Sequence, residues 1–149
     1  MKTSRFILLA VIVFSIPGFT SCDDENDNTL LSSSLRFKVQ RATFEGNAIT
    51  PLPDYTLNIS YDNSGTITGY TATNSNTFTP TPANSGMVTI NDSMVTFTSG
   101  SDSRTCTITS GNLSQASTTL SLSFALNKID DGIEASEEGT YIYHLNVVD

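Results

Sequence analysis

The stretch TTLSLSFAL at residues 118–126 alternates between apolar and polar side chains with a period of two. On an extended chain, one face carries Leu120, Leu122, Phe124 and Leu126, and the other carries Ser121 and Ser123. Such a chain can bury its apolar face in a core while its polar face stays hydrated. The stretch is therefore predicted to be a half-buried β-strand, with Leu122 inward and Ser121 outward.

The same alternation recurs along the chain from residue 35 onward. It is clearest in YTLNISY at 55–61 and in GTYIYHLNVV at 139–148. Further strands are predicted at LRFKVQ (35–40), TITGYTAT (66–73), MVTIND (87–92), SMVTFTS (93–99) and RTCTITS (104–110). Short turn sequences rich in Gly, Asn, Asp and Ser separate most of them. We therefore expect one all-β domain over residues 35–149, an antiparallel meander of about eight strands.

Two architectures can accommodate such a meander. A closed barrel, similar to that of the lipocalins, has no strand edges, whereas a β-sandwich leaves edges that must be protected. The chain has no tryptophan, and Cys106 is its only cysteine after Cys22, so the immunoglobulin signature of a tryptophan and a disulfide is absent. The lipocalin-like barrel is favoured over the β-sandwich, which stays open as the alternative.

Two connections between the predicted strands are long. NSNTFTPTPANSG at 74–86 contains Pro80 and Pro82, which cannot donate hydrogen bonds in a sheet, so a loop or edge segment is expected there. NKIDDGIEASEEG at 127–139 is acidic and has room for one helical turn. Long loops on a β-scaffold are where binding sites are most often found.

The N-terminus has the features of a secretory signal peptide over residues 1–21. Lys2 and Arg5 precede an apolar run from Phe6 to Ile16, which Pro17 ends. This run is shorter than the roughly 20 residues that a membrane-spanning helix needs.

The sequence FTSC at 19–22 resembles a bacterial lipobox, although Phe19 occupies a position where leucine is usual. The resemblance implies cleavage between Ser21 and Cys22 and attachment of diacylglycerol to the Cys22 thiol, so that the protein is held to a membrane by its N-terminal lipid. The alternative is a plain secreted protein with an incidental cysteine.

The acidic run CDDENDN that begins at Cys22 has three interpretations. Asp23, Asp24, Glu25 and Asp27 resemble the export tag of Bacteroidetes surface lipoproteins, which implies an outer-membrane protein exposed on the cell surface. In enterobacterial lipoproteins, an aspartate at the position of Asp23 instead signals retention in the inner membrane. The third interpretation is a flexible, solvated tether over residues 22–34.

The resemblance extends into the domain. The segments SGMVTINDSMVTF, TTLSLSF and DDGIEASEEGTYIYHL are similar to those of small uncharacterised Bacteroidetes surface lipoproteins. These are packing motifs, and the resemblance implies no activity.

Charge and composition exclude several classes of function. The chain has seven basic and fifteen acidic residues, and removing residues 1–21 takes away Lys2 and Arg5 but no acidic residue. Nucleic acids and anionic lipid surfaces are bound by clustered basic side chains, so neither is an expected partner.

Candidate catalytic and metal-binding groups are few. His144 is the only histidine, so a nucleophilic triad or a zinc site has few parts available, and we expect it to be a solvated side chain on its strand. The acidic residues of the second long loop are Asp130, Asp131, Glu134, Glu137 and Glu138. Their spacing does not match an EF-hand, so a solvated loop is favoured over a calcium site or carboxylate catalysis. No cofactor or metal is expected.

Three further groups of residues are candidates for other roles. Arg36, Lys38 and Arg41 are predicted to protect an edge strand or pair with acidic neighbours, with a basic ligand-binding stripe as the alternative. Ser93, in the tripeptide DSM at an expected hairpin tip, resembles the acceptor for O-linked glycans in Bacteroidetes. Cys106 is expected to be a small buried hydrophobe.

The tyrosines are candidates for packing the core or for lining a cavity: Tyr55, Tyr61, Tyr70, Tyr141 and Tyr143. Tyr70 is the one expected to escape the core, because a bulge is plausible beside it at Gly69.

The sequence thus predicts a lipid-anchored binding or accessory protein of the cell envelope without catalytic activity. Its ligand would be a small molecule, a glycan or an envelope protein, and the alternative function is a structural or assembly subunit of a surface complex.

Overall fold

The computed structural model describes residues 33–126 and 138–148. The predicted signal peptide, the lipidation site at Cys22 and the acidic run Asp23 to Asp27 lie outside these residues, as does most of the acidic loop. The described residues form nine strands, which are β1 (Ser33–Phe44), β2 (Asn47–Ala48), β3 (Thr56–Tyr61), β4 (Ile67–Thr73), β5 (Ser85–Asn91), β6 (Met94–Ser99), β7 (Asp102–Gly111), β8 (Thr119–Leu126) and β9 (Gly139–Val147). They include no helix that is long and apolar enough to cross a membrane.

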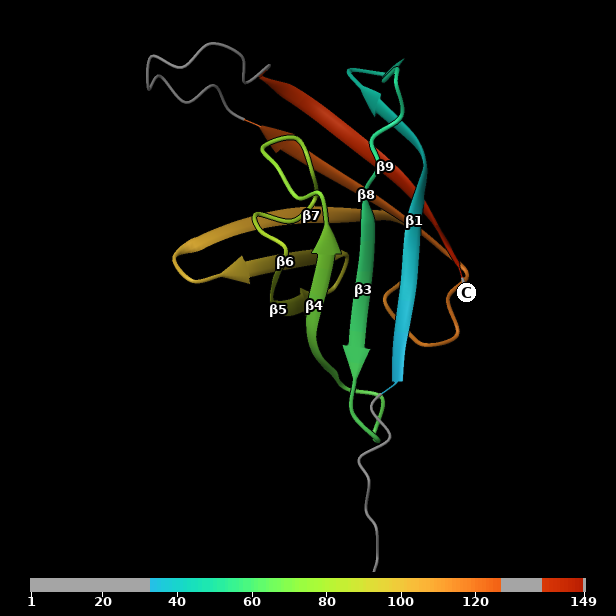
Figure 1. The fold of residues 1–149 in the computed structure, drawn as a ribbon, viewed down its shortest axis with the longest axis vertical. Coiled ribbons are helices and arrows are strands. Elements are labelled where there is room, and N and C mark those ends of the chain that lie inside the picture. The colour runs from blue at the N-terminus through green and yellow to red at the C-terminus, as the bar shows by residue number, and fades with distance from the viewer. Residues whose placement is uncertain (1–32, 127–137, 149) are drawn as a thin grey trace, which may run out of the picture.

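The strands form a closed antiparallel barrel (Figure 1). Each strand from β3 to β9 pairs with its neighbour in sequence, β1 pairs with β3, and pairing of β1 with β9 closes the sheet. Eight strands make up the barrel, and the short β2 is added at one end of β1. The prediction of an all-β, lipocalin-like barrel built as a meander is confirmed, and each of the eight predicted segments forms a strand.

Strand β1 closes the barrel because it pairs with two different neighbours along its length. Its first half, from Ser33 to Lys38, pairs with β3, and its second half, from Phe37 to Phe44, pairs with β9. A β-bulge at Gln40 lies between the pairs Val39–Leu145 and Arg41–His144, and bulges bend a strand in this way. The strand thus begins at Ser33, within the segment predicted to be a tether.

The prediction that the basic residues of β1 protect an edge strand is wrong, because β1 has a paired strand on each side. Alternation of side chains reports which face of a strand is buried, but it does not report how many neighbours the strand has. The alternative role, pairing with acidic neighbours, is found at Lys38, whose Nζ lies 3.8 Å from Asp54 Oδ1 in an exposed ion pair.

The barrel interior is filled by the apolar faces of all eight barrel strands. The largest fully buried side chains are Tyr55, Tyr61, Tyr143, Phe37, Phe97, Leu57, Ile59, Leu120, Leu122, Leu145, Val39 and Val95. Burying one such side chain stabilises the fold by about 1.5–3 kcal/mol. One end of the barrel is closed by the β7–β8 connection, where Leu113 is buried and its carbonyl oxygen accepts a 2.9 Å hydrogen bond from the Tyr61 hydroxyl.

Strands β4 and β5 meet at only two residue pairs, Tyr70–Gly86 and Thr71–Ser85. A Cβ at Gly86 would overlap the carbonyl oxygen of Thr98 on the next strand, β6, and would also crowd the Tyr70 ring on β4. The close contacts of Gly86 with both neighbouring strands therefore require glycine. The expected irregularity beside Gly69 is present, since the register between β3 and β4 shifts there. The prediction that Tyr70 escapes the core is nevertheless wrong: its side chain is buried and packs edge-to-face on Phe97, with ring centroids 5.2 Å apart.

Candidate functional site

The long connection between β4 and β5 lies at the upper end of the barrel (Figure 1), and its middle part, Thr79 to Thr81, is buried. We call residues 74–84 the plug loop. Pro80 and Pro82 lie outside the strands, as predicted. Thr79 and Thr81 are completely buried, so the plug loop fills the part of the barrel interior that side chains of the strands leave empty.

A chain of hydroxyl groups ties the plug loop to the barrel wall. The Tyr55 hydroxyl lies 3.0 Å from Thr81 Oγ1, which lies 2.8 Å from Ser75 Oγ. Ser75 Oγ in turn donates to the carbonyl oxygen of Ala83 at 3.0 Å. Each hydroxyl can donate to the next along this chain, so the buried polar atoms of the plug loop are satisfied.

Arg104 holds the plug loop from the opposite wall. It extends from β7 in phase with the buried Cys106, lies over the ring of Phe124 at 5.5 Å, and donates to the carbonyl oxygen of Thr79. Burial lowers the pKa of Arg104, but a guanidinium group stays protonated at any physiological pH. The sequence analysis did not identify Arg104 as a functional residue. It lies two residues before Cys106 on the same strand, however, and this spacing places both side chains on the inward face.

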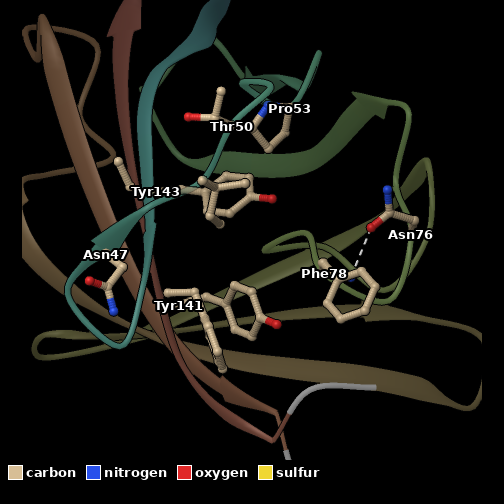
Figure 2. A pocket seen from close by; sticks show the side chains of 10 residues that line it. Asn47, Thr50, Pro53, Asn76, Phe78, Tyr141 and Tyr143 are labelled. Atoms are coloured by element: carbon tan, nitrogen blue, oxygen red, sulfur yellow. Dashed lines mark hydrogen bonds between the residues drawn. The ribbon is translucent and has the colours of Figure 1, made fainter. Parts of the chain in front are cut away.

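A cleft of about 560 Å³ opens between the plug loop and the hairpin that follows β1. It is lined by Phe44, Asn47, Ala48, Ile49, Thr50, Pro53, Asn76, Phe78, Tyr141 and Tyr143. Figure 2 shows the two tyrosines between the Asn76–Phe78 segment on one side and the hairpin with Asn47 and Thr50 on the other. Clefts of this size at the mouth of a β-barrel are common sites for small ligands.

The aromatic side chains of the cleft form one packed cluster. The ring of Tyr141 lies 4.7 Å from Phe44 and 5.8 Å from Phe78. Behind it, Phe124 is stacked on Tyr141 at 5.5 Å. These contacts hold the rings in place, so the cleft presents preformed aromatic surface.

The polar groups of the cleft are amides and hydroxyls. Asn76 Oδ1 accepts a hydrogen bond of 2.8 Å from the backbone N–H of Phe78, which orients the amide, and its Nδ2 has no hydrogen-bond partner among the described residues. Asn47 Nδ2 donates to the carbonyl oxygen of Glu45 at 3.4 Å. Burial raises the pKa of Tyr143 to about 12, so this hydroxyl stays neutral. The lining therefore carries no charge at neutral pH.

The sequence predicted only part of this cleft. Tyr141 and Tyr143 were candidates for lining a cavity, and the loop that carries Asn76 and Phe78 was a candidate for binding. Phe44 and the hairpin residues were not identified, because they reach the cleft only through the closure of β1 onto β9.

His144 lies on the outer face, half-buried rather than fully solvated as predicted. Its Nε2 lies 2.9 Å from Arg41 Nη2, and its Nδ1 lies 2.9 Å from Ser121 Oγ. Arginine can only donate, so Nε2 accepts and the proton of the neutral ring sits on Nδ1. The ring therefore donates to Ser121, and it does not take a proton from the serine as a general base would.

Ser121 is the second residue whose environment differs from the prediction. It faces outward as expected, but only 7% of it is exposed, because His144 covers it. Alternation along β8 correctly placed it on the outer face, whereas its burial comes from the neighbouring strand β9.

Other predicted residues are where the sequence placed them. Cys106 is buried, with its Sγ 3.5 Å from the carbonyl oxygen of Pro80, and burial raises its pKa to about 12. Ser93 is exposed in the turn between β5 and β6, which leaves its role as a glycan acceptor a prediction. Arg36 is exposed on β1.

No group of three or more potential metal ligands occurs among residues 33–126 and 138–148. Of the acidic loop, Glu138 is described and exposed. Asp130, Asp131, Glu134 and Glu137 lie outside the described residues, so the predicted solvated loop and its alternatives, a calcium site or carboxylate catalysis, have no structural test.

Comparison with known proteins gives no relative from which a function can be transferred. No family model matches the chain, and neither a curated protein nor a solved structure matches it significantly. The chemistry of the cleft is therefore inferred from its own residues.

Proposed function

We propose that this protein is a non-catalytic binding protein of the cell envelope, held to the outer membrane by a lipid on Cys22 and exposed on the cell surface. Its ligand-binding site is the cleft between the plug loop and the β1–β2 hairpin. The ligand is uncharged, because the lining residues carry no charge and an unpaired ion is costly to remove from water.

The observation that carries this proposal is the preformed aromatic cleft at the mouth of a barrel that is packed with buried side chains. The plug loop and the core side chains occupy the rest of the barrel, and Leu113 covers its other end. The cleft thus combines apolar rings with a few oriented polar groups, which is the usual composition of a small-molecule site.

The direction of β1 also supports a surface binding function. Its first residue, Ser33, pairs with Tyr61 near the end closed by Leu113, while its last residue, Phe44, lines the cleft (Figure 1). An anchored chain would therefore enter the barrel at the end opposite the cleft. In this orientation the cleft faces away from the membrane and is accessible to ligands in the medium.

A second function, as a subunit of a surface complex, is favoured by a different region. Beyond its two pairs with β4, strand β5 has no partner on that side within the part of the chain described here. Met87, Ile90 and Met94 on the β5–β6 hairpin are exposed by 61%, 43% and 49%. A strand with one partly unpaired edge and exposed apolar side chains can add a strand from another protein. Crosslinking in the native envelope would distinguish this function, because Met87→Lys should then remove a specific crosslinked partner.

The binding function is tested by thermal unfolding of the purified protein with a panel of neutral probes: indole, 2-naphthol and neutral oligosaccharides. A compound that binds only the folded protein raises its melting temperature by mass action. Ala48→Trp would fill the cleft with an indole ring. Ala125→Trp places the same ring on the exposed outer face of β8 and serves as the matched control.

We expect at least one probe to stabilise the wild-type protein and Ala125→Trp but not Ala48→Trp. A panel without any effect, or stabilisation that survives Ala48→Trp, would contradict the assignment of the cleft.

A further inference from the structure

We propose that the ligand of this cleft is a neutral glycan, bound through one sugar ring seated against the aromatic cluster. This inference rests on the proposed binding function and narrows it to one chemical class. It follows from three properties of the lining: its unused hydrogen-bonding groups, its aromatic surface and its lack of charge.

The first property, the unused hydrogen-bonding groups, begins with an amide that has an unused donor. Because Asn76 Oδ1 is occupied by the N–H of Phe78, its Nδ2 is the group available to a ligand. A hydrocarbon ligand would remove this N–H from water without replacing its hydrogen bonds, at a large cost. The ligand must therefore bring an acceptor to the position of Asn76 Nδ2.

The second unused hydrogen-bonding group is the amide of Asn47, on the opposite side of the cleft. Its Nδ2 donates one N–H to the backbone oxygen of Glu45, so its Oδ1, which needs a donor, and its second N–H are available to a ligand. The Thr50 hydroxyl, which also lines the cleft, can donate or accept. A ligand that offers both donors and acceptors along its edge satisfies all three residues, and hydroxyl groups do this most simply.

The second property, the aromatic surface, requires a ligand with an apolar face. Phe44 and Phe78 are half-buried, and with the ring of Tyr141 they form an aromatic wall that favours contact with C–H groups or another ring. A molecule with an apolar face, an edge of hydroxyl groups and no charge is a sugar ring. The cleft is open at its rim, where Asn47, Thr50 and Asn76 are exposed, so further sugar units can continue into solvent.

Asn76→Asp is the most informative variant. The aspartate retains the oxygen that accepts from Phe78 N–H, so the plug loop keeps this hydrogen bond, but the Nδ2 donor is lost. Asn63→Asp makes the same chemical change in the exposed β3–β4 turn, at the end of the barrel away from the cleft. Phe78→Leu is a second variant, which keeps an apolar side chain but removes the ring. Melting temperatures establish that each variant is folded.

Binding is measured by a glycan array of neutral and acidic oligosaccharides, followed by isothermal titration with the neutral oligosaccharides that score. We expect neutral glycans to bind the wild-type protein and Asn63→Asp equally well. Asn76→Asp should bind about tenfold more weakly, as loss of one hydrogen bond to the ligand implies. Phe78→Leu should weaken binding as well, which tests the aromatic wall even if Asn76→Asp does not fold.

The outcomes separate this inference from the function on which it rests. If indole or 2-naphthol stabilises the protein in a manner that Ala48→Trp abolishes, but no glycan binds, the binding function stands and the glycan assignment is wrong. If no probe binds, both are wrong. Glycan binding that is insensitive to Asn76→Asp and Phe78→Leu would place the sugar outside the cleft and overturn the inference.

Discussion

The Tyr55 hydroxyl lies 3.0 Å from Thr81 Oγ1, and this contact joins the barrel wall to the tip of the plug loop. Neither residue has measurable exposure to solvent. Burial raises the pKa of Tyr55 well above its ordinary value, so the hydroxyl keeps its proton for this hydrogen bond at all physiological pH values. The plug loop, and with it the Asn76–Phe78 wall of the cleft, is thus held by this buried hydroxyl chain together with Arg104.

Replacing Tyr55 with phenylalanine should therefore destabilise the protein by about 1–3 kcal/mol, because Thr81 loses a buried hydrogen-bond partner. The free energy of unfolding in urea measures this cost. Thr89→Val, on the exposed outer face of β5, should change it by less than about 0.5 kcal/mol. Similar values for the two variants would show that the hydroxyl chain contributes little to stability.

His144 should titrate below its ordinary value near 6.5, because burial and the nearby Arg41 both lower its pKa. The unfolded chain then binds more protons than the folded one, so stability should fall as the pH drops below about 6.5 and level off below the folded pKa. Nitrogen-15 NMR should find the proton of the neutral ring on Nδ1, and Arg41→Met should raise the pKa. A neutral ring protonated on Nε2 would contradict the hydrogen-bond assignment.

Three substitutions on β8 test its two faces. Leu122→Ala should cost about 2–5 kcal/mol through lost burial and a residual cavity. Ser121→Ala should cost about 0.5–1.5 kcal/mol, since it removes the acceptor for His144. Ser123→Ala, on the same outer face, should stay within about 0.5 kcal/mol. Urea unfolding measures all three, and equal costs at residues 121 and 123 would show that the His144 contact is not stabilising.

Lipid attachment at Cys22 predicts that Cys22→Ser abolishes labelling by radioactive or azide-bearing fatty acids in the native host. The mutant protein should also leave the membrane fraction. The buried Cys106 is the natural control, because its thiol is shielded and its pKa is raised to about 12. A Cys22→Ser protein that still labels and still pellets with membranes would show that the lipobox interpretation is wrong.

Surface export is tested separately by replacing Asp23, Asp24 and Glu25 together with alanine. If these residues form an export tag, fatty-acid labelling should be unchanged while protease digestion of whole cells no longer removes the protein. Unaltered protease accessibility would leave the acidic run with the role of a solvated tether.

The alternation of side chains predicted every strand of the barrel because it is a local property. Whether Leu122 or Ser121 faces the core depends only on the geometry of an extended chain, in which successive side chains point to opposite faces. The short turns between strands likewise predicted the order of most pairings. For the same reason, the burial of Cys106 followed from its neighbours in sequence.

The residues that build the cleft could not be predicted in this way. Phe44 and Tyr141 are far apart in the chain, and they meet only because a bulge at Gln40 lets β1 leave β3 and pair with β9. Tyr70 was expected to point outward beside a bulge, but the close approach of Gly86 gives its ring room to pack on Phe97. Bulges and close approaches depend on contacts between strands, which sequence periodicity does not encode.

The sequence by itself determined the class of fold and the inward face of most strands, since both depend on neighbouring residues, whereas export and lipid attachment stay predictions from the N-terminal sequence. Only the tertiary structure decided that the sheet closes, that a proline-containing loop fills the barrel mouth and that Arg104 is an inward cation satisfied by Thr79 and Phe124. The physical reason is that buried polar groups need partners, and Thr81 and Arg104 find theirs in distant parts of the chain, at Tyr55 and at the carbonyl oxygen of Thr79. The cleft lies between the plug loop and the hairpin that follows β1, the strand that closes the barrel.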